Sequence, residues 1–173
     1  MIGVKKIELL SPVGNIECLY QAIHNGCDAV YLGGKKFGAR NFANNFNEEE
    51  LVHAIKYCHL YGVKIYVTVN TIIFDDEIDE FLGYIKFLYE NNVDAVIMQD
   101  LGMIKRVREL YPSLEIHAST QMHNHNAEGV KLLEKLGVKR VVFARELSIQ
   151  EINNISTNME REVFVHGALC VCY

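Results

Sequence analysis

The sequence has no excess of basic residues and no long apolar run, and each absence excludes a class of protein. The 17 Lys and Arg residues are outnumbered by 22 Asp and Glu, which gives a formal net charge of −5. This charge argues against non-specific nucleic-acid binding over the whole surface, but a local patch is compatible with it. No apolar run reaches the roughly 18 residues of a membrane span, and the first residues lack the apolar core of a signal peptide. We therefore expect a cytoplasmic protein.

Several catalytic motifs are also missing. The sequence contains no HExxH, no P-loop, no GxSxG and no defensible Ser-His-Asp order. His123 and His125 lie two residues apart in a loop, without a carboxylate at the spacing of a zinc protease, so we expect no metal there. Proteolysis needs an activated nucleophile or a metal-bound water, and the sequence shows neither.

Cysteines are few and their spacing is irregular. Three of the five, Cys18, Cys27 and Cys58, lie in or beside apolar periodic segments, where a free cysteine packs as a small hydrophobe. Cys170 and Cys172 lie together near the last residue, but alternate residues of an extended chain point to opposite sides. This pair alone is a poor metal site. Either both cysteines pack, or one belongs to a longer motif.

Strand-like and helix-like runs alternate along the whole chain. The expected strands are 7–12, 27–34, 63–71, 93–100, 114–120, 138–145 and 161–167. The expected helices are 15–26, 47–62, 75–92, 101–112, 126–137 and 148–156. Strict alternation implies right-handed βαβ units and a parallel sheet, either doubly wound and open or closed as a barrel. The doubly wound fold would need a GxGxxG fingerprint after the first strand, and SPVGNIE has one glycine.

Alternation within the strands favours the barrel. In IYVTVN, the apolar Ile65, Val67 and Val69 alternate with a second set that carries polar groups. The segments EIHASTQ and EVFVHG alternate in the same way, whereas an open sheet covered on both faces is apolar on both sides. We predict an incomplete TIM-type (βα) barrel of seven parallel strands and six helices. It forms one partial domain over residues 1–173, and a full barrel takes about 250 residues.

Polar residues at the carboxyl ends of the strands are the candidate site residues, because barrel enzymes build their sites at that mouth. They are Asn15, Arg40, Asn70, Gln99, Asp100, Ser119, Gln121, Arg145, Glu146 and His166. Structural alternatives are open for several of them. Asn15 and Asp100 suit helix caps, Arg145 and Glu146 could form an internal ion pair, and His166 could be a core histidine on the same side as Glu162.

The final stretch, EVFVHGALC, resembles the signature of peptidase family U32, the collagenase-like proteases. Its signature positions are filled by Glu162, Phe164, Gly167, Ala168, Leu169 and Cys170. The Gly and second Cys that follow in the family pattern are missing, so we expect a chain truncated at the C-terminus. Other stretches resemble the family in the same order, namely ELLSPVGN, CDAVYLGG, FGAR, VTVNT, VIMQDLG, HASTQM and FARELS.

The resemblance implies two different chemistries. The family name implies a protease, whereas other relatives hydroxylate RNA bases or a ubiquinone precursor without molecular oxygen. Those relatives hold a [4Fe–4S] cluster on four cysteines and use prephenate as the hydroxyl source. By this resemblance Cys170 is a cluster ligand in an incomplete set, so the cluster is expected to be absent from this chain, and Cys172 lies outside the pattern.

Our leading hypothesis is oxygen-independent hydroxylation of a tRNA or rRNA base by the full-length relative. The expected substrate-binding residues are Arg40, Asn70, Gln99, Ser119, Gln121, Arg145 and Glu146, which suit an anionic small molecule such as prephenate. Glu162 and His166 are the candidate catalytic residues. A genuine peptidase and a non-catalytic scaffold are the alternatives. Exposed sheet edges at the first and last strands would favour homo-oligomers.

Overall fold

A computed structural model describes residues 7–39 and 45–167 and contains the predicted alternation of strands and helices. The strands are β1 (Leu10–Pro12), β2 (Ala29–Gly33), β3 (Lys64–Val69), β4 (Ala95–Met98), β5 (Glu115–Ala118), β6 (Arg140–Val142) and β7 (Glu160–Glu162). The helices are α1 (Ile16–His24), α2 (Glu48–Leu60), α3 (Ile78–Glu90), α4 (Leu101–Leu110), α5 (Ala127–Lys135) and α6 (Ile149–Asn154). Two short 3₁₀ turns, η1 (Asp75–Glu77) and η2 (Thr120–Met122), follow β3 and β5.

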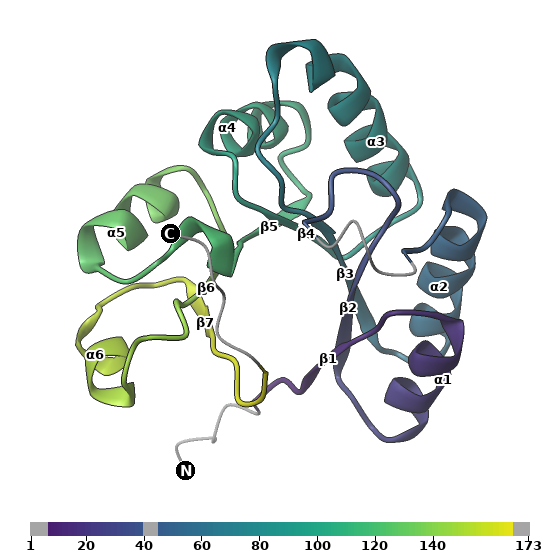
Figure 1. Ribbon diagram of the computed structural model, residues 1–173, viewed down its shortest axis with the longest axis horizontal. Helices are drawn as coiled ribbons and strands as arrows, with labels where there is room; N and C mark the ends of the chain where they lie inside the picture. The colour runs from purple at the N-terminus through teal and green to yellow at the C-terminus, as the bar shows by residue number, and fades with distance from the viewer. Residues whose placement is uncertain (1–6, 40–44, 168–173) are drawn as a thin grey trace.

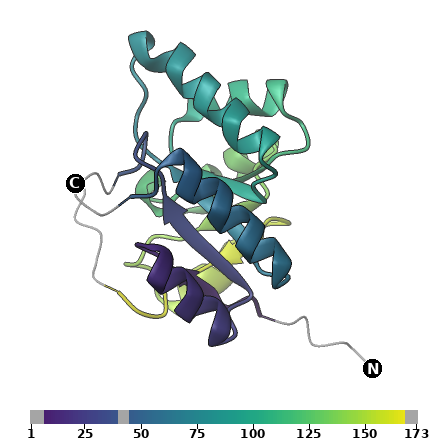
Figure 2. The same cartoon turned by 90° about the vertical axis from the view of Figure 1, so that its right-hand side faces the viewer.

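The seven strands form one parallel sheet in sequential order, β1 to β7. Figure 1 shows the sheet curving around a central axis, with the six helices outside it. In the side view of Figure 2, α1 and α2 run alongside β2 on its outer face, with the strand visible between them. The prediction of an incomplete TIM-type barrel is therefore confirmed.

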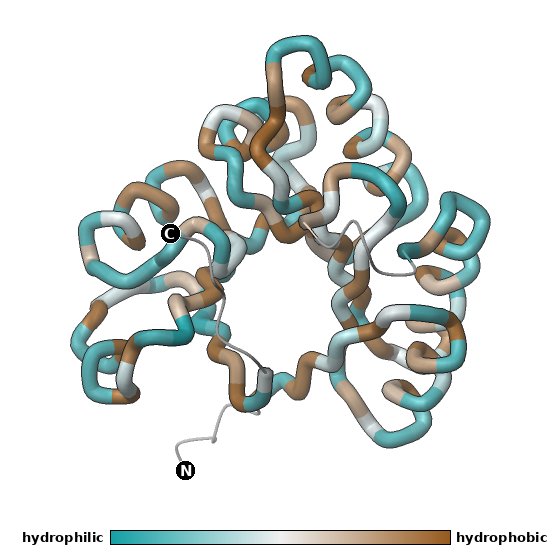
Figure 3. Tube along the Cα trace, viewed as in Figure 1, coloured by the Kyte–Doolittle hydropathy of each residue, from teal (hydrophilic) through white to brown (hydrophobic). Residues whose placement is uncertain are grey.

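Strand β3 shows why the chain curves into a barrel. Ile65, Val67 and Val69 point outward and join the large apolar core between sheet and helices. Tyr66 points inward and packs with Ala29, Ala95 and Ile97 from the neighbouring strands, as the alternation predicts. In Figure 3 the strands are largely hydrophobic, while the helices alternate between hydrophilic and hydrophobic residues.

Side-chain caps fix where the helices start, close to the strand ends. Asn15 accepts a hydrogen bond from the Cys18 amide at 2.8 Å, and Asp100 accepts one from the Met103 amide at 3.0 Å. Asp100 also accepts from the Ile73 amide at 3.2 Å, which ties the loop after β3 to the start of α4. These two residues have the capping role that the sequence left open for them.

The last strand is shorter than the sequence predicts. We expect a strand over 161–167, but β7 ends at Glu162, and Val163 and Val165 are 48% and 91% exposed. Alternation of apolar and polar residues therefore stops predicting burial after Glu162, since no described part of the chain covers these two valines. The expected helix over 75–92 likewise opens with the 3₁₀ turn η1 before α3 begins.

The sheet has two edges within the described residues, because β1 pairs with β2 alone and β7 with β6 alone. These are the edges for which the sequence predicts self-association, and that association stays a prediction. Among residues 7–39 and 45–167, no helix is both long and apolar enough to cross a membrane.

Candidate functional site

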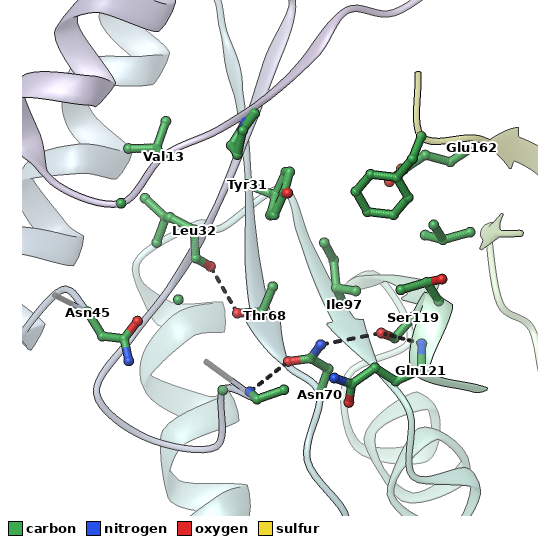
Figure 4. A pocket seen from close by; sticks show the side chains of 18 of the residues that line it. Val13, Tyr31, Leu32, Asn45, Thr68, Asn70, Ile97, Ser119, Gln121 and Glu162 are labelled. Atoms are coloured by element: carbon green, nitrogen blue, oxygen red, sulfur yellow. Dashed lines mark hydrogen bonds between the residues drawn. The ribbon is translucent and has the colours of Figure 1, made fainter. Parts of the chain in front are cut away.

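A cavity of about 150 Å³ opens at the carboxyl ends of the strands. Side chains and backbone from all parts of the sheet line it (Figure 4): Pro12, Val13, Gly14, Tyr31, Leu32, Gly33, Gly38, Ala39, Asn45, Thr68, Asn70, Ile97, Ser119, Thr120, Gln121, Val142, Arg145, Glu162 and Phe164. A concave site with a few polar groups at the mouth of a barrel is the usual place for a ligand.

Asn70 lies at the centre of the polar wall. Its Oδ1 accepts from the Ala39 amide at 3.1 Å, and its Nδ2 donates to Ser119 Oγ at 3.3 Å (Figure 4). Its backbone carbonyl accepts from Gln99 Nε2 at 2.7 Å, and the same nitrogen donates to Gln121 Oε1 at 3.1 Å. Through its side chain and backbone, Asn70 at the end of β3 therefore connects the loop after β2 with the ends of β4 and β5.

The end of β5 is held by a second amide. Asn124 is buried and donates from Nδ2 to the carbonyls of Ser119 and Val142, both at 3.0 Å. The predicted alternation of inward and outward side chains stops at this strand end. Thr120 and Gln121 belong to η2, and both line the cavity. The polar wall is thus fixed by hydrogen bonds between neighbouring strand ends.

Gly33 allows two side chains to approach the backbone of β2. A Cβ at this position would lie 3.1 Å from Thr68 Oγ1 and 3.2 Å from Asn45 Oδ1. The Thr68 hydroxyl donates to the Leu32 carbonyl at 3.3 Å. A larger residue would displace both polar groups from the cavity wall.

Arg145 is the one basic residue in the described lining of the cavity. Its guanidinium lies 3.7 Å from the ring centroid of Phe164, within the range of a cation–π contact. Its Nε is buried and has no hydrogen-bond partner among the described residues. The cation is therefore held over an aromatic ring, with one buried donor that lacks a partner among the described residues.

Below the cavity, the barrel interior contains a charged cluster around Arg140. Its Nη1 donates to Glu8 Oε1 at 2.6 Å and to Glu162 Oε2 at 3.3 Å. Its Nη2 and Nε donate to Glu160 Oε2 at 2.6 and 3.0 Å. The side chain of Arg140 is only 8% exposed, so this is a buried charge compensated by three carboxylates.

Two aromatic rings complete this interior layer. Tyr66 donates its hydroxyl to both oxygens of Glu8, at 3.0 and 3.1 Å, and lies under the Arg140 guanidinium. His117 packs edge-on against Tyr66 with ring centroids 4.7 Å apart and is fully buried. Burial lowers the pKa of His117, although the nearby carboxylate of Glu115 opposes this shift. His117 is therefore neutral near pH 7.

The structure brings together five of the predicted site residues. Asn70, Ser119, Gln121, Arg145 and Glu162 all line the cavity. Gln99 lies behind them and holds Asn70 and Gln121.

Other predicted residues lie elsewhere. Glu146 and His166 are exposed and do not line the cavity, and no ion pair joins Arg145 to Glu146 among the described residues. Arg40 and Cys170 lie outside the described residues.

Sequence reasoning missed part of the site. Tyr31, Thr68 and Phe164 line the cavity, and Arg140 anchors its floor, but we considered only polar residues at strand ends. Inward alternation was the available signal, since Thr68 shares the side of β3 that holds Tyr66. The same signal applies to Arg140. It lies two residues before Val142, which lines the cavity, so the two side chains share the inward side of β6.

The described residues do not supply a ligand set for a metal cluster. Within residues 7–39 and 45–167, no group of three or more His, Cys, Asp or Glu side chains is placed to hold a metal ion. Cys18 is exposed on α1, while Cys27 and Cys58 are buried, and burial raises the pKa of the Cys58 thiol to about 12. Cys27 and Cys58 therefore pack as the sequence predicts, whereas the prediction is wrong for the exposed Cys18.

Comparison with known proteins identifies the family. The sequence model described as "Peptidase family U32" matches residues 14–173. The chain belongs to peptidase family U32. Membership was predicted from the EVFVHGALC stretch and is confirmed by a match over nearly the whole chain.

Relatives within family U32 have different names. The chain is 40% identical to tRNA hydroxylation protein P1 of Bacillus subtilis over 98% of its own length and 40% of that protein. It is 42% identical to the 23S rRNA 5-hydroxycytidine C2501 synthase of Escherichia coli over 99% of its length and 26% of that protein. A collagenase of Porphyromonas gingivalis is 34% identical over 98% of the chain and 44% of that protein. The chain thus spans less than half of each of these relatives.

A solved structure supports the fold of this U32 chain. The structure described as "The Structure of the U32 Peptidase Mk0906" superposes with a TM-score of 0.77, over 94% of this chain and 70% of that one. Sequence identity is 12%, so the likeness concerns the fold alone.

Proposed function

We propose that this chain forms the ligand-binding barrel portion of an RNA-hydroxylating enzyme of family U32. The observation that carries the proposal is the composition of the cavity. It combines the guanidinium of Arg145 with amide and hydroxyl groups of Asn70, Ser119 and Gln121. Such a wall suits a small anion with several oxygen atoms. Similarity of 40–42% to the tRNA and rRNA hydroxylation proteins supports RNA as the second substrate.

The anion that we propose is prephenate, the hydroxyl source implied by the family resemblance. One carboxylate would pair with Arg145, whose buried Nε has no partner among the described residues. The ring of Phe164 packs against the guanidinium and restricts its movement. A guanidinium can form two parallel hydrogen bonds to a carboxylate. The ends of β3 and β5 then provide Asn70, Ser119 and Gln121 for the remaining oxygens.

The cavity fits peptide hydrolysis less well. Its described lining includes no His, Cys or Asp, and the hydroxyl of Ser119 accepts from Asn70 and from the Gln121 amide rather than facing a base. A serine hydroxyl needs an adjacent general base to attack a carbonyl. The alternative of a genuine peptidase therefore lacks an activated nucleophile in this part of the chain.

The iron–sulfur cluster of the family resemblance belongs to the proposal too, with Cys170 as one ligand. The described residues provide no others, and nothing in the arrangement above depends on the cluster. The chain's own contribution is to bind and orient the anion at the barrel mouth.

Two measurements test the proposal. Isothermal titration of the purified chain with prephenate should show binding, and Arg145→Ala should weaken it by about 100-fold, the loss of a bidentate ion pair. Lys105→Ala, on the exposed surface of α4, is the matched charge control and should leave binding unchanged. Deletion of the gene should remove a hydroxylated nucleoside from total tRNA or rRNA, as measured by mass spectrometry. Unchanged nucleosides together with gelatin cleavage by the purified chain would support the peptidase instead.

A further inference from the structure

We propose that the hydroxyl of Ser119 donates a hydrogen bond to the ligand in the cavity, and that Asn70 is the positioning residue that directs it there. This inference rests on the proposed function in one respect, the anionic nature of the ligand. It adds the direction of each hydrogen bond on the polar wall, and hence the kind of ligand atom that this wall recognises. Figure 4 shows Ser119 joined by dashed lines to Asn70 on one side and to Gln121 on the other.

A backbone group fixes the orientation of the Asn70 amide. The N–H of Ala39 donates to Asn70 Oδ1 at 3.1 Å, so the oxygen of this amide faces the loop after β2. A flipped amide would place its NH2 group against the Ala39 N–H, and two donors would then face each other. The hydrogen bond of 3.3 Å between Asn70 Nδ2 and Ser119 Oγ therefore has one direction, from the amide to the hydroxyl oxygen.

The oxygen of Ser119 accepts a second hydrogen bond, from the backbone N–H of Gln121 at 3.2 Å. A serine oxygen has two lone pairs and one proton, so these two N–H groups occupy both lone pairs. The proton of the hydroxyl must then point away from both donors. Ser119 is 2% exposed, and no described residue accepts from its hydroxyl. Because Ser119 lines the cavity, a ligand oxygen there would be the acceptor for this buried proton.

The side chain of Gln121 has the same polarity. Gln99 Nε2 donates to the backbone carbonyl of Asn70 at 2.7 Å, which fixes the orientation of the Gln99 amide. The same nitrogen donates to Gln121 Oε1 at 3.1 Å, so the nitrogen is the end of the Gln121 amide that no described residue engages. Asn70 Nδ2 also has a second proton beside the one that it donates to Ser119. The side chains between the ends of β3 and β5 therefore present donors to the cavity.

This polarity determines what the polar wall recognises. Ser119, Gln121 and Arg145 all present N–H or O–H groups, so together they suit the oxygen atoms of a carboxylate and offer no acceptor to an ammonium group. Hydrogen bonds to an ionised oxygen are also about twice as strong as those between neutral groups. The arrangement occupies the lone pairs with which a serine nucleophile would attack a carbonyl. Ser119 is therefore suited to bind the anion and not to form a covalent bond.

Asn70→Asp separates the direction of the Ser119 hydroxyl from its presence. An aspartate still accepts from the Ala39 amide but cannot donate, so the Ser119 proton should turn toward the new carboxylate and away from the ligand. Hydrogen exchange at the Ala39 amide should stay slow in Asn70→Asp, because its acceptor is retained. This readout shows that the loop after β2 is still held in the variant.

Prephenate binding is then measured for the unsubstituted chain, Ser119→Ala, Asn70→Asp and the double variant, by isothermal titration and by ligand-detected NMR where affinity is low. Ser119→Ala should weaken binding by at least about tenfold, the loss of one hydrogen bond to a charged group. In the Asn70→Asp background, Ser119→Ala should change affinity by less than about twofold. The charge added at position 70 weakens binding by itself, but it is present in both members of this comparison.

Two variants outside the cavity are the matched controls. Asn91→Asp adds the same charge at the C-terminal end of α3, and Ser113→Ala removes an exposed serine hydroxyl. Neither residue lines the cavity, so each substitution should change prephenate affinity by less than about twofold.

The outcomes separate this inference from the proposed function. Unchanged binding in Ser119→Ala, or an equal loss from Ser119→Ala in both backgrounds, would overturn the inference and leave the proposed function standing. Inorganic phosphate is the second probe. If phosphate binds with the expected pattern of losses and prephenate does not bind, the proposed ligand is wrong and the role of Ser119 holds. If neither anion binds to the chain, both the proposed ligand and the inference are overturned.

Discussion

Arg140 Nη1 donates to Glu8 Oε1 at 2.6 Å, a contact between residues 132 positions apart in the chain. Glu8 precedes β1, whereas Arg140 opens β6, so this ion pair spans the barrel interior near the two edges of the sheet. The same guanidinium also reaches Glu162 in the cavity wall. Four predictions follow from this contact and from the contacts around the cavity.

Arg140→Met should destabilise the fold by about 3–5 kcal/mol, because three carboxylates in the barrel interior would lose their cation. The free energy of unfolding, measured by urea denaturation, checks this. Arg106→Met is the matched control, since Arg106 is 56% exposed and its ion pair with Glu109 lies on the surface of α4. We expect that control to change stability by less than about 0.5 kcal/mol. Equal effects of the two substitutions would mean that the buried cluster has no special role.

Two carboxylates of the cluster should give stability opposite pH dependences. The pKa of Glu8 is lowered in the folded chain, so its contribution is present above the ordinary value of 4.5 and is lost as the pH falls below it. The pKa of Glu162 is raised, so its contribution is present below 4.5 and is lost as the pH rises through the folded value.

Urea midpoints between pH 3 and pH 8 separate these two contributions. Glu8→Gln should flatten the acid side of the profile, and Glu162→Gln should remove a decline on the side above 4.5. If the two substitutions changed the profile in the same direction, the assignment of charges within the cluster would be wrong.

Asn70→Ala should loosen the loop after β2, because the Ala39 amide donates to Asn70 Oδ1. We expect a stability loss of about 1 kcal/mol, the usual worth of a lost hydrogen bond, with faster hydrogen exchange at the Ala39 amide. Prephenate binding should weaken as well, since the substitution also removes a contact to Ser119. Thr157→Ala, outside the cavity, removes a hydrogen bond to the Met159 amide and is the control for a general loss of stability. Exchange at Ala39 that is unchanged in Asn70→Ala would contradict the contact.

Gly34→Ala should destabilise the fold by about 1–3 kcal/mol, because a Cβ would lie 2.0 Å from the hydroxyl of Tyr84. That hydroxyl is buried and has no hydrogen-bond partner among the described residues. Tyr84→Phe should therefore cost little alone, and it should recover much of the loss when combined with Gly34→Ala. Thermal unfolding of the four chains of this double-mutant cycle measures the coupling. Strictly additive effects would show that Tyr84 shifts away without cost.

Much of the fold follows from local sequence patterns. The sequence predicted which side chains of β3 face the helices, because Ile65, Val67 and Val69 are all apolar. These three residues form part of the core between sheet and helices. For Asn15 and Asp100 the sequence left two roles open, a helix cap and a site residue. In the structure both side chains cap a helix. Such features depend on neighbours within a few residues, which the sequence displays directly.

The remaining features depend on distant partners. Arg140 reads as one basic residue in an apolar strand, and its role emerges only when Glu8 and Glu162 are placed beside it. The length of β7 also depends on what covers it, so alternation could not show that Val165 is exposed. Site residues on regular strands were therefore easier to predict than those on the segment after β7.

The sequential strand order has a consequence for how the barrel assembles. Each strand pairs with the next one along the chain, so contacts within the sheet close short loops and should form early in folding. The contact from Glu8 to Arg140 closes a very long loop and should form among the last. Through Arg140 and Glu162, the residues just before β1 are mechanically connected to the cavity wall. A change close to the N-terminus, even a purification tag, could therefore alter ligand binding at the opposite end of the barrel.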